Sequence, residues 1–408
     1  MHATFHARSN SSSDAAMMVR RGLAALLLAF ALLPLGEVVA PVSATVANAA
    51  GREPLYEIAF VGPISGSARR FTLNLEDAAR LAVNNANASH QLRFQLRLVA
   101  YDTKGNSDIR AALLHRLVAN KRVVAVIGPT SPDGVQEAGP ILSRARVAMV
   151  TPTVTTPSLA TLGFANFFRD VPDDTVQGAA DADFLVRALG SQRLFVVSDA
   201  SVYGNTLSSA VSARATVDGA SVVNQSAPIT SNCGGTASAT EYASVALAAL
   251  ASQATSLFYG GLNCDFGLLL DALNNVGFHG VVLSDDGANA NELLSATASI
   301  SAADGVYLSC GCVTSTNATF NREFASLAHV SASSASYAVE SYDAANAIIN
   351  ALRTLKVVTR AALVNALHRV TVHGISRTFR FQANGNMTGT SVFISQVQGH
   401  QIAPLGFA

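Results

Sequence analysis

Hydroxyl and carboxyl side chains follow several short apolar stretches of this chain, and their types suit the capture of a small charged molecule. Ser131, Thr153 and Thr155 follow two such stretches, and Asp285 and Asp286 follow a third. Hydroxyls and backbone amides at the start of a helix suit a carboxylate, because that helix end carries a partial positive charge. Either aspartate suits an ammonium group. Each of these residues alone also fits an ordinary helix N-cap, so only their convergence would make a site.

The elements that must position these residues alternate along the chain. From Tyr56 onward, short β-branched or apolar runs are followed by longer segments of helical period, such as 75–85 and 107–120. This alternation is typical of an α/β fold with parallel-rich sheets, in which the loops at the carboxyl ends of the strands form the ligand site. The predicted strands are 56–61, 94–101, 123–127, 147–150, 193–198, 221–224, 256–259, 280–283 and 305–308.

Two changes of pattern predict the domain organisation. The segment 167–174 interrupts the alternation and divides about four strand–helix units from the next four, so we place a domain crossing there. After Cys312 the chain becomes strongly helical, over 318–328, 336–355 and 360–369. It then ends in two strand-like runs, 378–382 and 391–398, and Asn384-Gly385 between them predicts a hairpin turn.

Residues 1–49 are predicted to be a cleaved secretory signal peptide. Arg20 and Arg21 precede an apolar run from Leu23 to Leu35, and a tract of small residues ends at Ala47-Asn48-Ala49. This run is shorter than a membrane-spanning helix requires. The remaining chain of about 360 residues is long enough for two domains. The chain has 27 basic and 27 acidic residues, and this balance argues against a nucleic-acid-binding surface.

Four cysteines, Cys233, Cys264, Cys310 and Cys312, all lie in the second half of the chain. An exported protein meets an oxidising environment, so we expect at least one disulfide. Four cysteines allow three pairings, and the sequence does not choose among them. We favour Cys264 with Cys310 or Cys312, because a bond between Cys310 and Cys312 would be strained. No cysteine or histidine pattern has zinc-ligand spacing, and no metal or cofactor is predicted.

Five loop motifs, taken in order, resemble those of type I periplasmic solute-binding proteins. They are Gly62-Pro63-Ile64-Ser65-Gly66, Gly128-Pro129-Thr130-Ser131, Thr151-Pro152-Thr153-Val154-Thr155-Thr156-Pro157, Asp199-Ala200-Ser201-Val202-Tyr203-Gly204 and Tyr259-Gly260-Gly261. The resemblance is greatest to the leucine/isoleucine/valine-binding proteins of ABC transporters and covers about residues 55–400. Any one motif is common, whereas five in this order are fairly specific.

The resemblance implies two Rossmann-like lobes that are joined by three hinge crossings and close over a ligand. The first crossing would lie near 167–174, the second near 309–316 and the third near 376–380. Lobe I would then comprise 50–170 and 313–376, and lobe II 171–312 and 377–408.

The resemblance also implies the site. By position, Thr155 and the backbone of Thr153 match ligand-contacting residues, Tyr203 matches an aromatic lid residue, and Asp286 matches an acidic residue that binds ammonium. Phe71 stands where an aromatic residue shapes the ligand pocket. The first loop departs from the family pattern, because it reads Ser131-Pro132-Asp133, but Ser131 can substitute for the usual hydroxyl.

We therefore expect a monomeric periplasmic protein that captures an amino acid or a related amide or carboxylate and delivers it to an ABC permease in the inner membrane. The alternative is a sensing or accessory module of the same fold, which reports its ligand to a membrane receptor. The sequence contains none of the common dinucleotide, phosphate-loop, zinc-protease or nucleophile-elbow motifs, so we do not expect an enzyme.

Overall fold

The computed structural model describes residues 53–66, 69–227, 239–289, 293–297, 300–399 and 401–408 of the chain. Residues 52–408 form one compact unit. The predicted signal peptide, residues 1–49, lies outside the described residues. Within the described ranges, no helix is both long enough and apolar enough to span a membrane.

The first sheet contains five parallel strands, and the sequence predicts four of them within one residue or so. The central strands are buried along nearly their whole length, as expected for a parallel sheet covered on both faces. The edge strand falls in the segment that we expected to be only a crossing. In spatial order the strands are β2 (Gln95–Asp102), β1 (Leu55–Gly62), β3 (Val123–Ile127), β4 (Ala148–Thr151) and β5 (Phe167–Arg169).

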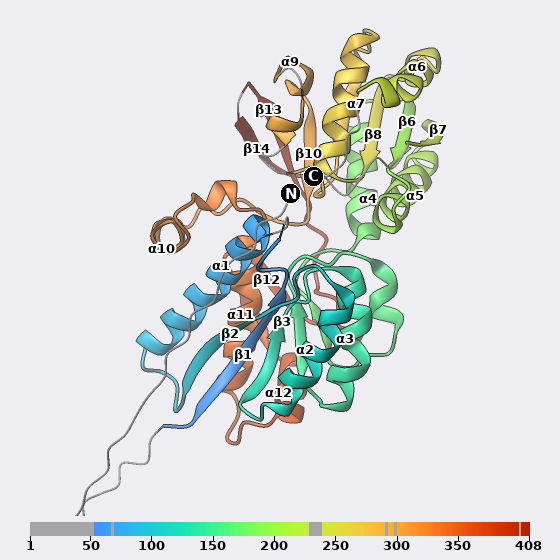
Figure 1. Ribbon diagram of the computed structural model, residues 1–408. Coiled ribbons are helices and arrows are strands. Elements are labelled where there is room, and N and C mark those ends of the chain that lie inside the picture. Colours follow the sequence, from blue (N-terminus) through green and yellow to red (C-terminus); the bar gives the residue numbers. More distant parts are fainter. Residues whose placement is uncertain (1–52, 67–68, 228–238, 290–292, 298–299, 400) are drawn as a thin grey trace, which may run out of the picture. The chain divides into compact units, whose positions relative to one another are not determined.

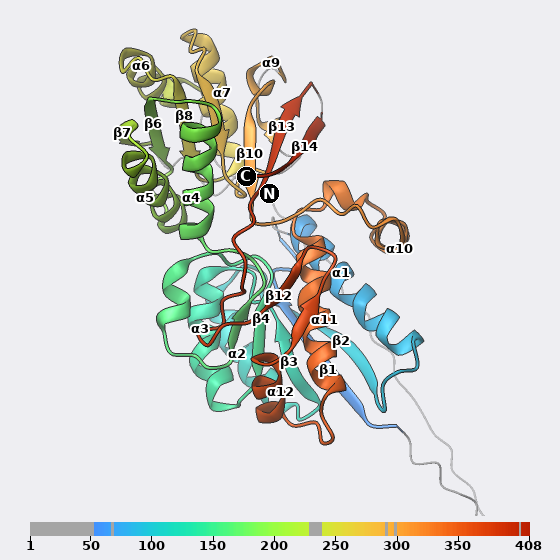
Figure 2. The same cartoon turned by 180° about the vertical axis from the view of Figure 1, so that it is seen from behind.

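Helices cover both faces of this sheet. Alternate residues of β1 point to opposite faces, since Ile58 packs in one core cluster with Ile348, and Ala59 packs in another with Leu114. Figure 1 shows the second face in front, and Figure 2 shows the first. The first face carries α1 (Arg69–Ala88), α11 (Ala338–Arg353) and α12 (Arg360–Leu367), and the second carries α2 (Ser107–Ala119), α3 (Pro132–Arg144) and the short η1 (Pro157–Thr161). The remaining helices of this part are α10 (Ala318–Ala328) and η4 (Ala332–Ser334), which pack against α1.

The second sheet has seven strands in the described part of the chain. Its parallel strands are joined at one edge by two antiparallel strands from the end of the chain. The order is β14 (Gln401–Phe407), β13 (Phe393–Gln398), β10 (Tyr307–Cys310), β9 (Val281–Ser284), β8 (Ser256–Gly260), β6 (Arg193–Ser198) and β7 (Ser221–Ser226). One face is covered by α4 (Asp174–Asp183), η2 (Phe184–Ala188) and α5 (Val202–Val217), the other by η3 (Ala239–Tyr242), α6 (Ala243–Ala251), α7 (Asn263–Asn275), α8 (Leu293–Ala296) and α9 (Ile300–Ala303). The α/β fold with parallel-rich sheets is therefore confirmed.

The predicted hairpin between the last two strand-like runs is wrong. The first run forms β12 (Thr378–Arg380), which pairs with β11 (Thr371–His373), whereas the second run, β13, pairs with β10 and β14. Asn384-Gly385 does turn the chain, but it joins Phe381 to Met387 through an isolated bridge. Phe379 and Phe381 are buried in the core cluster of the first sheet, so the segment packs there and does not pair with β13.

The favoured disulfide pairing is also wrong. Cys310 and Cys312 are bonded to each other, with a Cα–Cα distance of 4.9 Å. The chain turns at Gly311 and so brings the two cysteines within the usual range for a disulfide, despite the single residue between them. Cys264 is disulfide-bonded as well, so its partner is neither of these two. Cys233 lies outside the described residues.

A buried arginine connects segments near the end of the first sheet. The Arg169 side chain has no exposed surface, and its guanidinium donates to the Thr156 carbonyl at 2.8 Å, to Asn386 Oδ1 at 2.9 Å and to Asp173 Oδ2 at 3.0 Å. Asn386 also donates to Asp173. Because a buried cation requires full pairing, this network fixes the segment that leads from β5 into α4.

A second arginine joins the segments that enter and leave the second sheet. Arg377 donates to the Gly311 carbonyl at 2.6 Å and to the Ser391 carbonyl at 3.1 Å. Its guanidinium lies 3.8 Å from the buried Glu340 carboxylate, which accepts from the Val313 amide. Arg377 therefore connects helix α11 to the segment that follows β10 and to the segment that precedes β13.

Candidate ligand-binding site

Asp286 is held by two phenols that come from different parts of the fold. It follows β9, and its carboxylate accepts a hydrogen bond from Tyr203 Oη at 2.6 Å and a second from Tyr337 Oη. Tyr203 lies in the first turn of α5, on the second sheet, whereas Tyr337 precedes α11, on the first sheet. Burial and the neighbouring carboxylates raise the pKa of both phenols well above the ordinary value, so both remain protonated donors.

Phe71 extends this group. Its ring meets the Tyr337 ring edge-to-face, with 6.3 Å between the centroids, and 38% of the residue is exposed. Of the predicted residues, the structure therefore brings together Asp286, Tyr203 and Phe71. The residue that joins them, Tyr337, was missed, because the helical pattern over 336–355 placed it inside a helix. It is in fact the N-cap, with a left-handed backbone (φ 64°).

Ser131 and Thr153 use their hydroxyls locally. Ser131 Oγ accepts from the Gly134 amide at 3.3 Å and caps α3, which is the ordinary alternative weighed above. Thr153 Oγ1 donates to the Thr130 carbonyl at 3.3 Å. Both lie at the carboxyl edge of the first sheet, as predicted, but no hydrogen bond within the described ranges links either of them to Asp286.

Thr155 lies next to an acid that sequence reasoning missed. The Asp174 amide donates to the Thr155 carbonyl at 3.0 Å. Burial raises the pKa of the Asp174 carboxyl to about 7; the Thr155 side chain offsets part of this rise, and the Asp286 carboxylate adds to it. Asp174 therefore links the two residues: its amide is hydrogen-bonded to Thr155, and its carboxyl interacts electrostatically with Asp286. The Pro-Asp-Asp sequence after β5 was the available signal, but we took it as a domain crossing only.

Asp285 is held mainly by a backbone amide rather than by the two phenols. Its side chain is buried, and its Oδ2 accepts from the Gly261 amide at 2.9 Å. Burial, and then the neighbouring Asp286, raise the pKa of Asp285 well above its ordinary value. Of the two aspartates that the sequence left open, Asp286 is therefore the one whose carboxylate accepts hydrogen bonds from both phenols.

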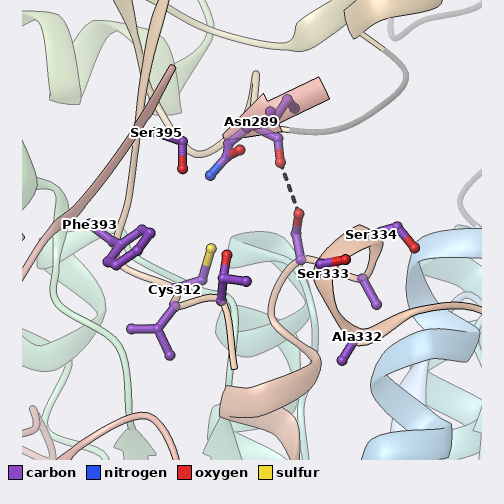
Figure 3. A pocket seen from close by; sticks show the side chains of 12 residues that line it. Asn289, Cys312, Ala332, Ser333, Ser334, Phe393 and Ser395 are labelled. Carbon is purple, nitrogen blue, oxygen red and sulfur yellow. Dashed lines mark hydrogen bonds between the residues drawn. The ribbon is translucent and has the colours of Figure 1, made fainter. Parts of the chain in front are cut away.

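A small pocket lies beside this group, and Figure 3 shows it from close by. It is lined by the loop after β9, the segment after the Cys310–Cys312 disulfide, the loop before α11, and strands β13 and β14. Ser336 Oγ donates to the Asn289 carbonyl at 2.9 Å (Figure 3). This bond joins the same two loops as the Tyr337–Asp286 bond. Asn289 lies three residues after Asp286, and Ser336 lies one residue before Tyr337.

The buried carboxyls predict a stability that falls as the pH rises. Burial raises the pKa of Asp174 and of Glu340 to about 7. A raised acid pKa contributes stability that is complete below the unfolded value, near 4, and is lost as the pH rises through 7. We expect the melting temperature to fall between pH 5.5 and 8, with each group losing roughly 2 kcal/mol of its stabilisation over that range. Asp218, whose pKa is lowered to about 2, titrates below this window.

The check is a series of thermal melts across that pH range. Glu340→Gln should flatten the dependence, whereas Glu53→Gln, at an exposed carboxyl, should leave it unchanged. A melting temperature that stays constant or rises towards pH 8 would contradict the assignment.

Two parallel-rich sheets with helices on both faces, and an acidic aromatic group held by segments from both parts, define an α/β protein with a candidate ligand site. The chain belongs to the periplasmic binding protein family, whose model matches residues 56–401. This is a family of solute-binding proteins, so the predicted type I family resemblance is confirmed.

Named relatives agree with this membership. The chain is 25% identical over 255 residues to an "Amino acid binding protein" of Pseudomonas aeruginosa, covering 62% of this chain and 66% of that protein. It is 27% identical over 247 residues to the Leu/Ile/Val-binding protein of Escherichia coli K12, covering 60% and 65%. The sequence match thus spans slightly less than two thirds of these curated relatives.

Solved structures show the same fold over more of the chain. The leucine binding protein LivK of Thermotoga maritima has a TM-score of 0.72 at 20% identity, covering 86% of this chain and 98% of that one. LivJ of Streptococcus pneumoniae in complex with isoleucine has a TM-score of 0.74 at 18% identity, with 86% and 99% coverage. A solute binding protein of R. palustris in complex with 4-hydroxybenzoate has a TM-score of 0.72 at 16% identity, covering 87% and 97%. The fold therefore accommodates different ligands.

Proposed function

We propose that this protein is the extracytoplasmic solute-binding component of an ABC importer and that it captures an amino acid or a related amine. The observation that carries the proposal is the Tyr203–Asp286–Tyr337 group, which joins loops of the two sheets around a carboxylate. Family membership supports the transport role. The names of the relatives support an amino-acid-like ligand.

In this proposal Asp286 receives the ammonium group of the ligand. Tyr203, Tyr337 and Phe71 line the site, and Thr155 and the loops that carry Ser131 and Thr153 provide the remaining polar contacts. The two phenols orient the Asp286 carboxylate, because they donate to it from both sides. A charge-assisted hydrogen bond to an ammonium group is strongest when the carboxylate is already held in position.

We further propose that the two sheets belong to two lobes that close over the ligand. The crossings would lie at 170–173, at 311–317 and at 388–392. The third is placed after Met387 rather than near 376–380, because Phe379, Phe381 and Met387 are buried with the first sheet. A ligand shifts the equilibrium towards closure only if it binds the closed form better. Contacts from both lobes to one ligand provide that difference.

We place this role in the periplasm, after removal of residues 1–49, with a monomer that delivers its ligand to a permease. The test is a thermal-shift screen of residues 50–408 against amino acids, amides, aromatic acids, short peptides and polyamines, because a ligand of the native state raises the melting temperature. We expect a rise with at least one amine. Thr155→Ala should reduce that rise, and an unaltered dissociation constant in this variant would remove Thr155 from the site.

A further inference from the structure

One face of helix α4 carries buried polar oxygens that lack well-formed hydrogen bonds. Asp174, Gln177 and Asp181 occur at intervals of three and four residues and therefore share a face of the helix. All three are completely buried. Both carboxylate oxygens of Asp174 and of Asp181, and Oε1 of Gln177, have no donor in good hydrogen-bond geometry within the described part of the chain, and the hydroxyls of Thr155 and Ser309 are only loosely placed beside the two acids. Buried polar atoms without partners are rare in native proteins and call for an explanation.

This face of α4 is directed towards the candidate site. Burial is the main cause that raises the pKa of Asp174 and of Asp181, and the Asp286 carboxylate adds to both rises, so Asp286 lies near enough to act on both ends of the row. Gln177 Nε2 donates to Ser309 Oγ on β10, at 3.1 Å, and so leaves Oε1 as the unpaired atom. The row extends about 10 Å along the helix axis, from the rise of 1.5 Å per residue.

The side chains around this row supply little positive charge. Among the described residues, no ion pair joins a lysine or arginine to Asp174, Asp181, Asp285 or Asp286. Arg169 acts on Asp174 from a distance and is already bonded to Asp173. The described residues also contain no group of three or more possible ligands that would hold a metal ion. Acidic groups are therefore in surplus over basic ones here, and a bound cation would favour their ionised forms.

Donors for a ligand carboxylate are few by comparison. The Thr153 hydroxyl donates to the Thr130 carbonyl, and both phenols donate to Asp286. A zwitterion with one ammonium group would neutralise one carboxylate and bring another anion close to the rest, which is unfavourable at low dielectric constant.

We propose that the ligand of this site is a linear aliphatic amine with two cationic groups, one bound by Asp286 with Asp174 and the other by Asp181 with Gln177. This inference rests on the proposed function and specifies its ligand class. The rings of Tyr203, Tyr337 and Phe71 are suitable neighbours for an alkylammonium chain, since aromatic faces attract cations and aliphatic groups pack against them. A diamine and a diamino acid share this chemistry.

The experiment is isothermal titration calorimetry of residues 50–408 with butane-1,4-diamine, lysine and leucine. We expect one or both of the dicationic compounds to bind at least tenfold more tightly than leucine. A preference for lysine over the diamine identifies a diamino acid, and the reverse identifies a diamine. Equal or tighter binding of leucine overturns the inference but leaves the proposed function intact, whereas no binding of any compound here or in the thermal-shift screen overturns both.

A variant pair locates the second cation. Asp181→Asn keeps the shape of the side chain and should weaken the dicationic ligand at least tenfold while changing leucine affinity less than twofold. Asp304→Asn, at an exposed aspartate directly after α9, should leave both affinities unchanged. Equal losses for leucine and the dicationic compound would overturn the assignment of Asp181.

Discussion

Replacing Asp286 with alanine is expected to weaken the binding of an amine ligand by about 2–5 kcal/mol. The carboxylate is half-buried and is oriented by Tyr203 and Tyr337, so its removal leaves the ligand ammonium without its counter-charge and both phenols without their acceptor. Isothermal titration calorimetry of wild type and variant, with the best compound of the thermal-shift screen, measures the change.

Two further variants distinguish the loss of the Asp286 charge from a nonspecific effect of substitution on ligand affinity. Asp286→Asn keeps an acceptor for the phenols but removes the charge, and we expect most of the loss to remain. Asp304→Ala removes an exposed aspartate from the same part of the chain and should leave the affinity unchanged. Unaltered affinity in Asp286→Ala would exclude this residue from the site.

Arg169→Met is expected to lower the free energy of unfolding by about 3–5 kcal/mol, the cost of removing one partner from a buried ionic network. The side chain is completely buried, and the substitution leaves the Thr156 carbonyl and Asn386 Oδ1 without their donor and the Asp173 carboxylate without its cation. Methionine fills much of the aliphatic volume, so the loss reflects polar groups rather than a cavity. Equilibrium unfolding in urea measures the difference.

Arg187→Met is the matched control. The Arg187 side chain is 60% exposed and pairs with Asp183 and Asp218, and Arg214 also pairs with both aspartates, so neither is left unpaired. Exposed ion pairs contribute about 0–1 kcal/mol, so we expect a small effect. If the two variants lose similar stability, the buried network around Arg169 does not have the role assigned to it.

Periodic hydrophobicity predicted most of the fold, because the parallel strands are continuous apolar runs and the helices each bury one face. The prediction failed where tertiary packing determines whether a segment is a strand and which strand it pairs with. The three residues of β5 are too few to show a period, and only pairing with β4 makes them a strand. β11 and β12 are equally short. The partner of β13 could not be predicted, because the core of the first sheet captures Phe379 and Phe381.

The site was predictable only in part. Asp286 and Tyr203 follow predicted strands, where a parallel fold concentrates its functional residues. Tyr337 lies before a helix, far along the chain, and no local pattern brings it to Asp286. Asp174 and Asp181 could be recognised only from burial. An aspartate in the first turn of a helix, such as Asp174, usually favours the helix dipole and faces solvent. Hydrogen-bond geometry likewise revealed that Ser131 caps α3.

The central claim is that the ligand binds at Asp286 between loops of the two sheets, and a crystal structure of the protein with the compound of largest thermal shift tests it most directly. We predict a ligand amine within hydrogen-bond distance of Asp286, with Tyr203 and Tyr337 beside it. A ligand bound only elsewhere, such as in the pocket of Figure 3 lined by Asn289 and Ser395, with Asp286 still held by the two phenols alone, would contradict the account.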